Sequence, residues 1–191
     1  MQKKKTLFIV EVGIFSALAF LLDLLANMLQ LKIWPQGGSI SIAMVPIFII
    51  AFRWGIKGGL AAGFMLGLLQ IVTGQAFIAH PLQGFIDYIL AFTLVGAAGL
   101  TSSSIIRAIK NDQERTTLLY VTLGTFLGSL LRYLCHTAAG VVFFAEYAPK
   151  GTPALLYSII YNGTYMLPGF IISAIISYLL IRSAKRFFFI N

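Results

Sequence analysis

Long apolar segments divide this sequence and restrict what it can fold into. Of its 191 residues, 59% are hydrophobic and only 10% are charged. Ordinary soluble proteins carry about 25% charged residues, so a soluble fold would lack polar side chains to cover its surface. In a bilayer, backbone groups must be satisfied within helices or a closed barrel. The apolar runs are too continuous for the alternating pattern of barrel strands. We therefore expect an all-α, polytopic membrane protein.

Six transmembrane helices in one membrane domain, residues 1–191, account for these segments. The predicted spans cover about residues 6–28, 39–53, 57–74, 82–101, 116–144 and 153–182. The second of them is short and contains Pro46, whereas the fifth and sixth are long enough to tilt in the membrane or to project beyond its apolar part.

Lysine and arginine are distributed unevenly between the connections, which sets the orientation. Of the 14 cationic residues, Arg132 lies within a span and the predicted outer connections hold only Lys32 and Lys150. The other eleven lie on the side of the two termini. We therefore expect a cell-membrane protein with both termini cytoplasmic. The net charge of +8 then reflects topology and anionic lipid rather than nucleic acid.

Polar and ionisable residues interrupt the last three spans near their outer ends. They are Asp87 in the fourth span, His136 in the fifth, and Tyr157 and Asn162 in the sixth, with Arg132 one turn below His136. Ionisable groups are costly in a bilayer, so they usually face a bundle interior or a cavity and indicate a functional site. The shared depth predicts a pocket that is loaded from outside.

Three further residues extend this predicted pocket. Gly140 and Phe144 continue the helical face of His136, and Tyr88 follows Asp87. The missing side chain of Gly140 would let a ligand approach the backbone. A carboxylate with amide and phenol groups beside aromatic faces suits an aromatic cation that carries ring donors and acceptors.

Structural roles remain open for several of these residues. Arg132 could pair with Asp87, or with Asp23 in the first span, because buried cations are normally neutralised by a partner. His136 alone could be a satisfied interior histidine. Asn162 alone could be a hydrogen-bonding contact between helices.

The predicted outer connections, residues 29–38, 75–81 and 145–152, supply a candidate lid. They carry Trp34, Phe77 and Tyr147 among glycine and proline turn residues. For Trp34, an interfacial aromatic belt explains the position equally well.

Small residues recur at helical spacing in two places. Gly13 and Ala17 form a small-xxx-small pair in the first span, and a second run follows one stripe over 55–67. Such pairs let helices approach closely in lipid, and internal packing is the favoured interpretation of the second run. No phosphate-binding loop of the Gly-x-x-x-x-Gly-Lys-Ser/Thr type is present, so powered transport would need ATPase subunits from other chains.

The order of several segments resembles a known family. These are EVGIFSALAF at 11–20, VPIFIIAFRWG at 45–55, DYILAFTLVGAAGL at 87–100, LLRYLCHTAAGVVFFAEYAPKG at 130–151 and YSIIYNG at 157–163. Together they resemble the thiamine-specific substrate-binding (S) components, ThiT type, of energy-coupling-factor (ECF) vitamin transporters.

The resemblance implies a six-helix protein that binds thiamine near the outer face. The family's ligand-binding residues fall on Asp87, Tyr88, His136, Gly140, Phe144, Tyr157 and Asn162, and its partner-docking motif falls on Gly13 and Ala17. A well-known member has glutamate at Asp87, tryptophan at Phe144 and alanine at Gly13. The shorter aspartate would require the ligand or helix to shift, or water to bridge.

We therefore predict a non-enzymatic subunit that captures thiamine outside the cell. It would present thiamine to a transmembrane coupling (T) protein with two ATPase subunits, and we expect no catalytic residue, metal or cofactor. Two alternatives stay open from the residues: an S component for another vitamin such as riboflavin, and an intramembrane enzyme that uses His136 with Asp87 for acid–base chemistry.

Overall fold

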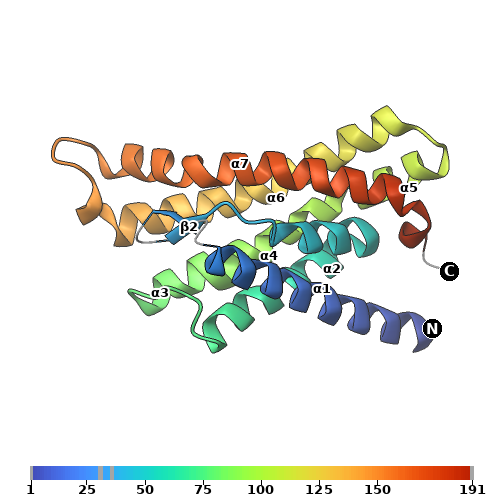
Figure 1. Cartoon of the computed structure of the whole chain (residues 1–191), viewed down its shortest axis with the longest axis horizontal. Helices are drawn as coiled ribbons and strands as arrows, with labels where there is room; N and C mark the ends of the chain where they lie inside the picture. Colours follow the sequence, from blue (N-terminus) through green and yellow to red (C-terminus); the bar gives the residue numbers. More distant parts are fainter. Residues whose placement is uncertain (1, 30–31, 35–36, 190–191) are drawn as a thin grey trace.

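Long helices that run along one axis build the molecule (Figure 1). The computed structural model describes residues 2–29, 32–34 and 37–189, and of residues 32–34, 37 and 39 it describes the backbone alone. Within these described residues, five helices are long and apolar enough to cross a membrane: α1 (Gln2–Met28), α2 (Met44–Val72), the continuous rod Pro81–Lys110, α6 (Glu114–Phe143) and α7 (Ala154–Ser183). The predicted all-α membrane class is confirmed.

The second and third predicted spans form the single element α2, which is broken at Gly55. This residue has φ 70° and ψ −163°, a left-handed conformation that glycine adopts at no steric cost. A Cβ added to Gly59 would meet the Cβ of Ala51, although eight residues of straight helix rise about 12 Å. The chain therefore folds back at Gly55. The part before the break, from Met44 to Arg53, is buried throughout.

A small hairpin precedes α2, where the sequence predicted helix from residue 39. Strand β1 (Lys32–Trp34) pairs antiparallel with β2 (Gly37–Ser39). Gly38, at φ +82°, lies so close to the ring of Tyr165 that an added Cβ would strike it. The start of the predicted span 39–53 is thus wrong, because residues 37–39 form strand β2 and the helix begins only at Met44.

The rod Pro81–Lys110 changes its helical type along its length. It comprises α3 (Pro81–Gly84), the π-helix η1 (Phe85–Leu90), α4 (Ala91–Val95), the 3₁₀-helix η2 (Gly96–Thr101) and α5 (Ser102–Lys110). It continues nine residues past the predicted end at residue 101, because Ile105 and Ile109 of α5 are buried in the core and Ser102 Oγ donates to Phe52 O (2.6 Å). π-Helical turns are rare and frequently occur at functional sites, and η1 carries Asp87 and Tyr88.

The glycine run of α2 positions η1 and α4. Cβ atoms added to Gly63 and Gly67 would overlap the carbonyl groups of Phe92 and Tyr88, respectively. Only residues without a side chain permit this approach, so internal packing explains these two glycines, as the sequence predicted. The contact fixes the part of the rod that faces the cavity described below.

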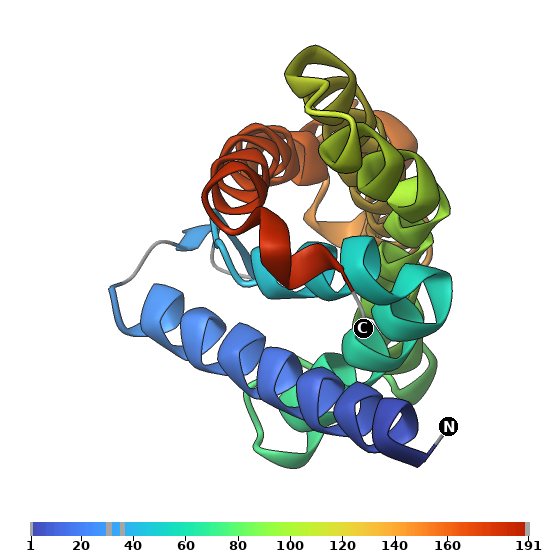
Figure 2. The same cartoon turned by 90° about the vertical axis from the view of Figure 1, so that its right-hand side faces the viewer.

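The last two long helices pack against each other and end in short 3₁₀ segments, η3 (Ala145–Tyr147) after α6 and η4 (Lys185–Phe188) after α7. The start of α1 and η4 lie at the same end of the molecule (Figures 1 and 2). There Arg53 forms a two-pronged ion pair with Glu11, at 2.5 and 2.7 Å, and its guanidinium lies 4.1 Å from the ring of Phe187. This buried ion pair joins α1, α2 and the C-terminal segment.

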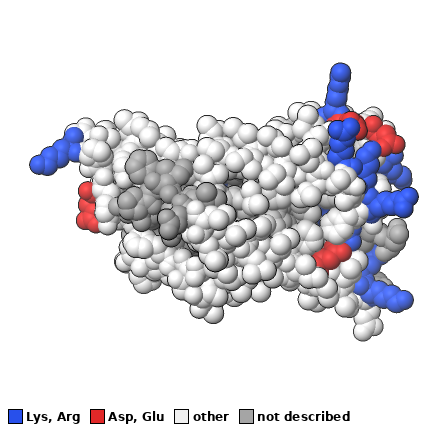
Figure 3. Space-filling view, in the orientation of Figure 1, with Lys and Arg blue, Asp and Glu red and all other residues white. Residues whose placement is uncertain are grey.

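Charged side chains separate toward the two ends of the bundle. Lysine and arginine gather at the end where α1 begins, whereas the broad middle of the visible face carries almost no charge (Figure 3). An uncharged middle with charged ends is the surface that a lipid bilayer requires.

Candidate ligand-binding site

A cavity opens among the helix ends that lie opposite the start of α1. Its volume is about 150 Å³, and since one water needs about 10–15 Å³ of such space, a small organic molecule fits. The lining residues come from α1, α2, α3, η1, α4, α6, η3, α7 and the connections between them. They include Asp23, Gln70, Phe77, Gln83, Asp87, Tyr88, Phe92, Arg132, His136, Gly140, Phe144, Tyr147, Tyr157, Ser158, Tyr161, Asn162 and Tyr165.

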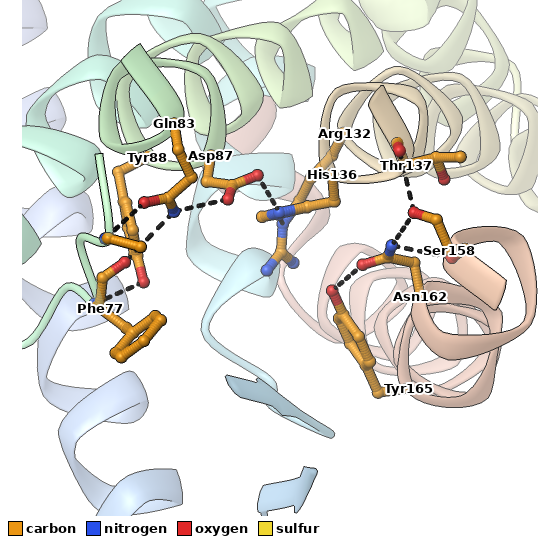
Figure 4. Close-up of polar contacts among 11 residues, drawn as sticks. Phe77, Gln83, Asp87, Tyr88, Arg132, His136, Thr137, Ser158, Asn162 and Tyr165 are labelled. Atoms are coloured by element: carbon orange, nitrogen blue, oxygen red, sulfur yellow. Dashed lines mark hydrogen bonds and ion pairs between the residues drawn. The ribbon is translucent and has the colours of Figure 1, made fainter. Parts of the chain in front are cut away.

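Asp87 and His136 form the central hydrogen-bonded pair of this cavity. His136 Nδ1 lies 2.8 Å from Asp87 Oδ1, and both side chains are almost buried. Arg132 Nε donates to His136 Nε2 (3.3 Å), and the guanidinium lies 4.7 Å from the ring of Phe92. Because Nε2 accepts this hydrogen bond, the proton of the imidazole is on Nδ1, so His136 is neutral and donates to Asp87. The direct Asp87–Arg132 pair considered from sequence is replaced by this relay (Figure 4).

Gln83 holds the other oxygen of Asp87. Its Nε2 donates to Asp87 Oδ2 (2.7 Å) and to Phe77 O (3.2 Å), and its Oε1 accepts from Ala79 N (2.9 Å). Tyr88 Oη accepts from Phe77 N (2.8 Å). The connection between α2 and α3 is therefore hydrogen-bonded to Gln83, which also bonds Asp87, and to Tyr88, which follows Asp87 in the chain (Figure 4).

A second polar group comes from α7 and faces the first in Figure 4. Asn162 donates to Ser158 O (2.9 Å) and accepts from Tyr165 Oη (2.5 Å). Ser158 Oγ donates to Thr137 O of α6 (2.9 Å). These bonds orient the amide of Asn162 at the cavity wall and join α7 to α6.

Gly140 has a packing role that the sequence did not predict. A Cβ added there would overlap Ser158 Oγ, and it would lie 3.6 Å from Asn162 Nδ2. The glycine thus allows α6 and α7 to approach closely beside the cavity, in addition to lining it.

Aromatic rings surround the polar groups. Phe77, Phe144 and Tyr147 form a row, with centroid separations of 6.3 and 6.1 Å. Two of the three candidate lid residues, Phe77 and Tyr147, thereby line the cavity beside Phe144. The side chain of the third, Trp34 in β1, lies outside the part of the chain that the structure describes.

A tyrosine row on α7 closes another side. Tyr157 and Tyr161 have ring centroids 5.7 Å apart, and Tyr161 and Tyr165 6.2 Å apart. Tyr161 and Tyr165 were not predicted, although they follow Tyr157 at successive steps of four residues, which could have indicated them.

The charges of the cavity do not cancel. Among the described side chains that line it, the charged groups are the carboxylates of Asp23 and Asp87 and the guanidinium of Arg132. With His136 neutral, one net negative charge remains, which favours a monocationic ligand over an anion. Asp23 accepts from Gln70 Nε2 (2.8 Å), and the Oε1 atom of Gln70 is buried with no partner in the part of the chain that the structure describes.

All seven predicted ligand-binding residues line this one cavity. Gly13 and Ala17 lie elsewhere, exposed on α1, and among the described residues no atom outside its own helix lies within 4 Å of a Cβ added to Gly13. The most consequential residue that sequence reasoning missed is Gln83. Its position one turn before Asp87 was the available signal.

Comparisons with known proteins agree with one another. The model of the family "Thiamine transporter protein (Thia_YuaJ)" matches residues 9–189. A protein of Bacillus subtilis named thiamine transporter ThiT is 45% identical over 185 residues, which are 97% of this chain and 95% of that protein. One of the same name from Lacticaseibacillus paracasei is 32% identical over 190 residues, 98% and 92% of the two chains. A solved structure of ThiT from Listeria monocytogenes superimposes with a TM-score of 0.90 at 33% identity, covering 97% of this chain and 98% of the other.

Proposed function

The chain belongs to the thiamine transporter protein family, and we propose that it is the substrate-binding S component of an ECF transporter, which captures thiamine in the cavity described above. The family is one of transporters and not of enzymes. The alternative of an intramembrane enzyme that uses His136 with Asp87 is therefore abandoned.

The charge and shape of the cavity carry the proposal. Thiamine joins an aminopyrimidine, which has hydrogen-bond donors and acceptors, to a permanently cationic thiazolium ring. The cavity offers one net negative charge, rings on several sides, and polar groups from three separate helices, namely Asp87, His136 and Asn162. A monocationic aromatic ligand satisfies all three properties, whereas an uncharged vitamin such as riboflavin leaves the charge unbalanced.

Each predicted residue has a role in this proposal. Asp87 balances the thiazolium charge or accepts hydrogen bonds from the ring system. Tyr157 and Asn162 bond the aminopyrimidine. His136 and Phe144 stack or pack against the ligand.

The remaining two predicted residues, Tyr88 and Gly140, line the pocket. Phe77 and Tyr147, with Trp34, belong to the connections that cover it.

We further propose six membrane passages with both termini in the cytoplasm. The fold-back at Gly55 makes α2 two passages, of which the first is short and enclosed by the bundle. The excess of lysine and arginine at the end where α1 begins (Figure 3) supports a cytoplasmic location for that end. The cavity, at the opposite end, then faces the outside of the cell.

The proposed partners are a transmembrane coupling protein, two ATPase subunits and the surrounding lipid. Gly13 and Ala17 are exposed on α1, where a helix of the coupling protein could approach closely. The absence of a phosphate-binding loop from the sequence agrees with ATP hydrolysis on other chains.

Calorimetric titration of the detergent-purified chain tests the thiamine proposal. We expect saturable binding of thiamine, no comparable binding of riboflavin, and weaker thiamine binding by Asp87→Ala and Asn162→Ala. Wild-type affinity in both variants would remove these residues from the site. Preference for riboflavin would replace thiamine as the ligand.

A further inference from the structure

Gln83 is buried beside the binding carboxylate, yet all of its polar atoms are engaged within the protein. Only 2% of its surface is exposed. Both hydrogens of its amide nitrogen are used, on Asp87 Oδ2 (2.7 Å) and Phe77 O (3.2 Å), and its oxygen accepts from Ala79 N (2.9 Å). An amide has two donor hydrogens, so none remains for a ligand. Gln83 therefore has no donor to offer a ligand, and it acts on the site through its neighbours.

Those neighbours belong to two different parts of the site. Asp87 lies on η1 and faces His136, whereas Phe77 and Ala79 belong to the connection between α2 and α3. The ring of Phe77 lies 6.3 Å from that of Phe144 in the aromatic row. One side chain thus joins the ionised wall of the cavity to its aromatic cover.

A second bond strengthens the same link. Tyr88, the neighbour of Asp87, accepts a hydrogen bond from Phe77 N (2.8 Å). The connection is consequently attached to η1 at two points, by Gln83 and by Tyr88. A displacement of Asp87 would therefore also displace Ala79, although the two residues do not share a hydrogen bond.

We propose that Gln83 is a positioning residue that holds the Asp87 carboxylate and the connection 75–80 as one unit. Binding at Asp87 and ordering of the Phe77 cover are then energetically coupled, and the coupling acts equally in both directions. For the ligand, this inference rests on the proposed function, since thiamine is taken as the molecule that reaches Asp87. The coupling within the ligand-free protein does not depend on it.

The alternative is that Gln83 only stabilises the fold. A double-mutant cycle with Asp87 distinguishes this structural role from the positioning role. Gln83→Met keeps the length of the side chain and removes its hydrogen bonds. We expect thiamine affinity to fall about tenfold in the wild-type background. In the Asp87→Ala background the same substitution should cost less than about twofold, because its main partner is already absent.

Gln70→Met is the matched control for this cycle. Gln70 is also a buried glutamine at the cavity wall, but it bonds Asp23 rather than Asp87. Its substitution should change affinity by the same factor in both backgrounds. If Gln83→Met also has equal effects in the two backgrounds, or leaves wild-type affinity unchanged, the positioning role is wrong. Absence of thiamine binding by the wild-type chain would instead contradict the proposed function.

Hydrogen exchange in the ligand-free protein tests the coupling without thiamine. Gln83→Met removes the acceptor of the Ala79 amide, so its exchange should accelerate. Asp87→Ala should also accelerate it, by at least about threefold, although Asp87 does not bond Ala79. The amide of Gln113, which bonds Ala108 O in the turn after α5, should be unchanged. An unaltered Ala79 rate in Asp87→Ala would overturn the inference.

Discussion

Gly140→Ala tests whether the close approach of α6 and α7 beside the cavity is required. The added Cβ would overlap Ser158 Oγ, which is itself fixed by its bond to Thr137 O (2.9 Å). Within a helix, glycine to alanine otherwise stabilises by about 1 kcal/mol, and forced overpacking costs about 1–3 kcal/mol. We expect the overlap to outweigh this gain, with a net loss of up to about 2 kcal/mol and weaker thiamine binding, because Asn162 depends on Ser158.

Ser158→Ala serves as the control, because its effect on stability should have opposite signs in the wild-type and Gly140→Ala backgrounds. Ser158→Ala removes the oxygen that the new methyl group would strike, and the nearest remaining atom, the Cβ of Ser158, lies 3.1 Å from it. In the wild-type background, Ser158→Ala should destabilise by about 1 kcal/mol through its lost hydrogen bonds. In the Gly140→Ala background it should stabilise instead.

Thermal unfolding of the four proteins in detergent, together with thiamine calorimetry, provides the comparison. Unchanged stability and affinity in Gly140→Ala would refute the packing argument. So would a Ser158→Ala substitution that destabilises both backgrounds equally, since the overlap would then have no part in the effect.

Three further perturbations follow from the contacts. His136→Ala removes a donor from Asp87 and should weaken thiamine binding by about 1–3 kcal/mol, whereas His136→Gln, which can still donate, should lose less; equal losses in calorimetry would contradict the relay. Arg53→Met leaves the buried Glu11 without its cation and should destabilise the protein by about 3–5 kcal/mol. Replacement of both Glu11 and Arg53 by methionine should destabilise it far less in thermal unfolding, and a greater loss in the double variant than in Arg53→Met would contradict this. The hydrogen bond from Lys185 (2.7 Å) and its charge lower the pKa of Asp112. The contribution of this pair to the stability of the fold is therefore present above the ordinary aspartate pKa, and it is lost as pH falls through the lowered pKa. NMR titration of Asp112 measures its pKa, and an ordinary aspartate pKa would show the pair to be absent.

Much of the site could be predicted from depth and polarity alone. Asp87, His136 and Asn162 each interrupt an apolar span near the same end, and a bilayer leaves such groups few places other than a common interior. The structure indeed brings the three together at one cavity. The helical class followed from the same physics, because continuous apolar segments satisfy their backbone groups internally.

What the sequence could not provide depends on contacts between segments. Spacing placed Arg132 and His136 on one face, but it could not decide which of them bonds Asp87. The sequence placed a boundary between the spans 39–53 and 57–74, but it could not show that the positive φ of Gly55 turns the chain back within one element. Gln83 comes two residues after Pro81, where a proline and a polar residue are ordinary for the first turn of a helix. Its role depends on its bonds to Asp87 and Ala79, which sequence does not show.

A thiamine titration of the purified wild-type chain, measured by calorimetry beside its Asp87→Ala variant, examines the cavity most directly. We predict one thiamine bound per chain, with at least about tenfold lower affinity in the variant. Heats that are absent in the wild type, or identical in the two proteins, would show that the negatively charged cavity is not where this chain holds thiamine.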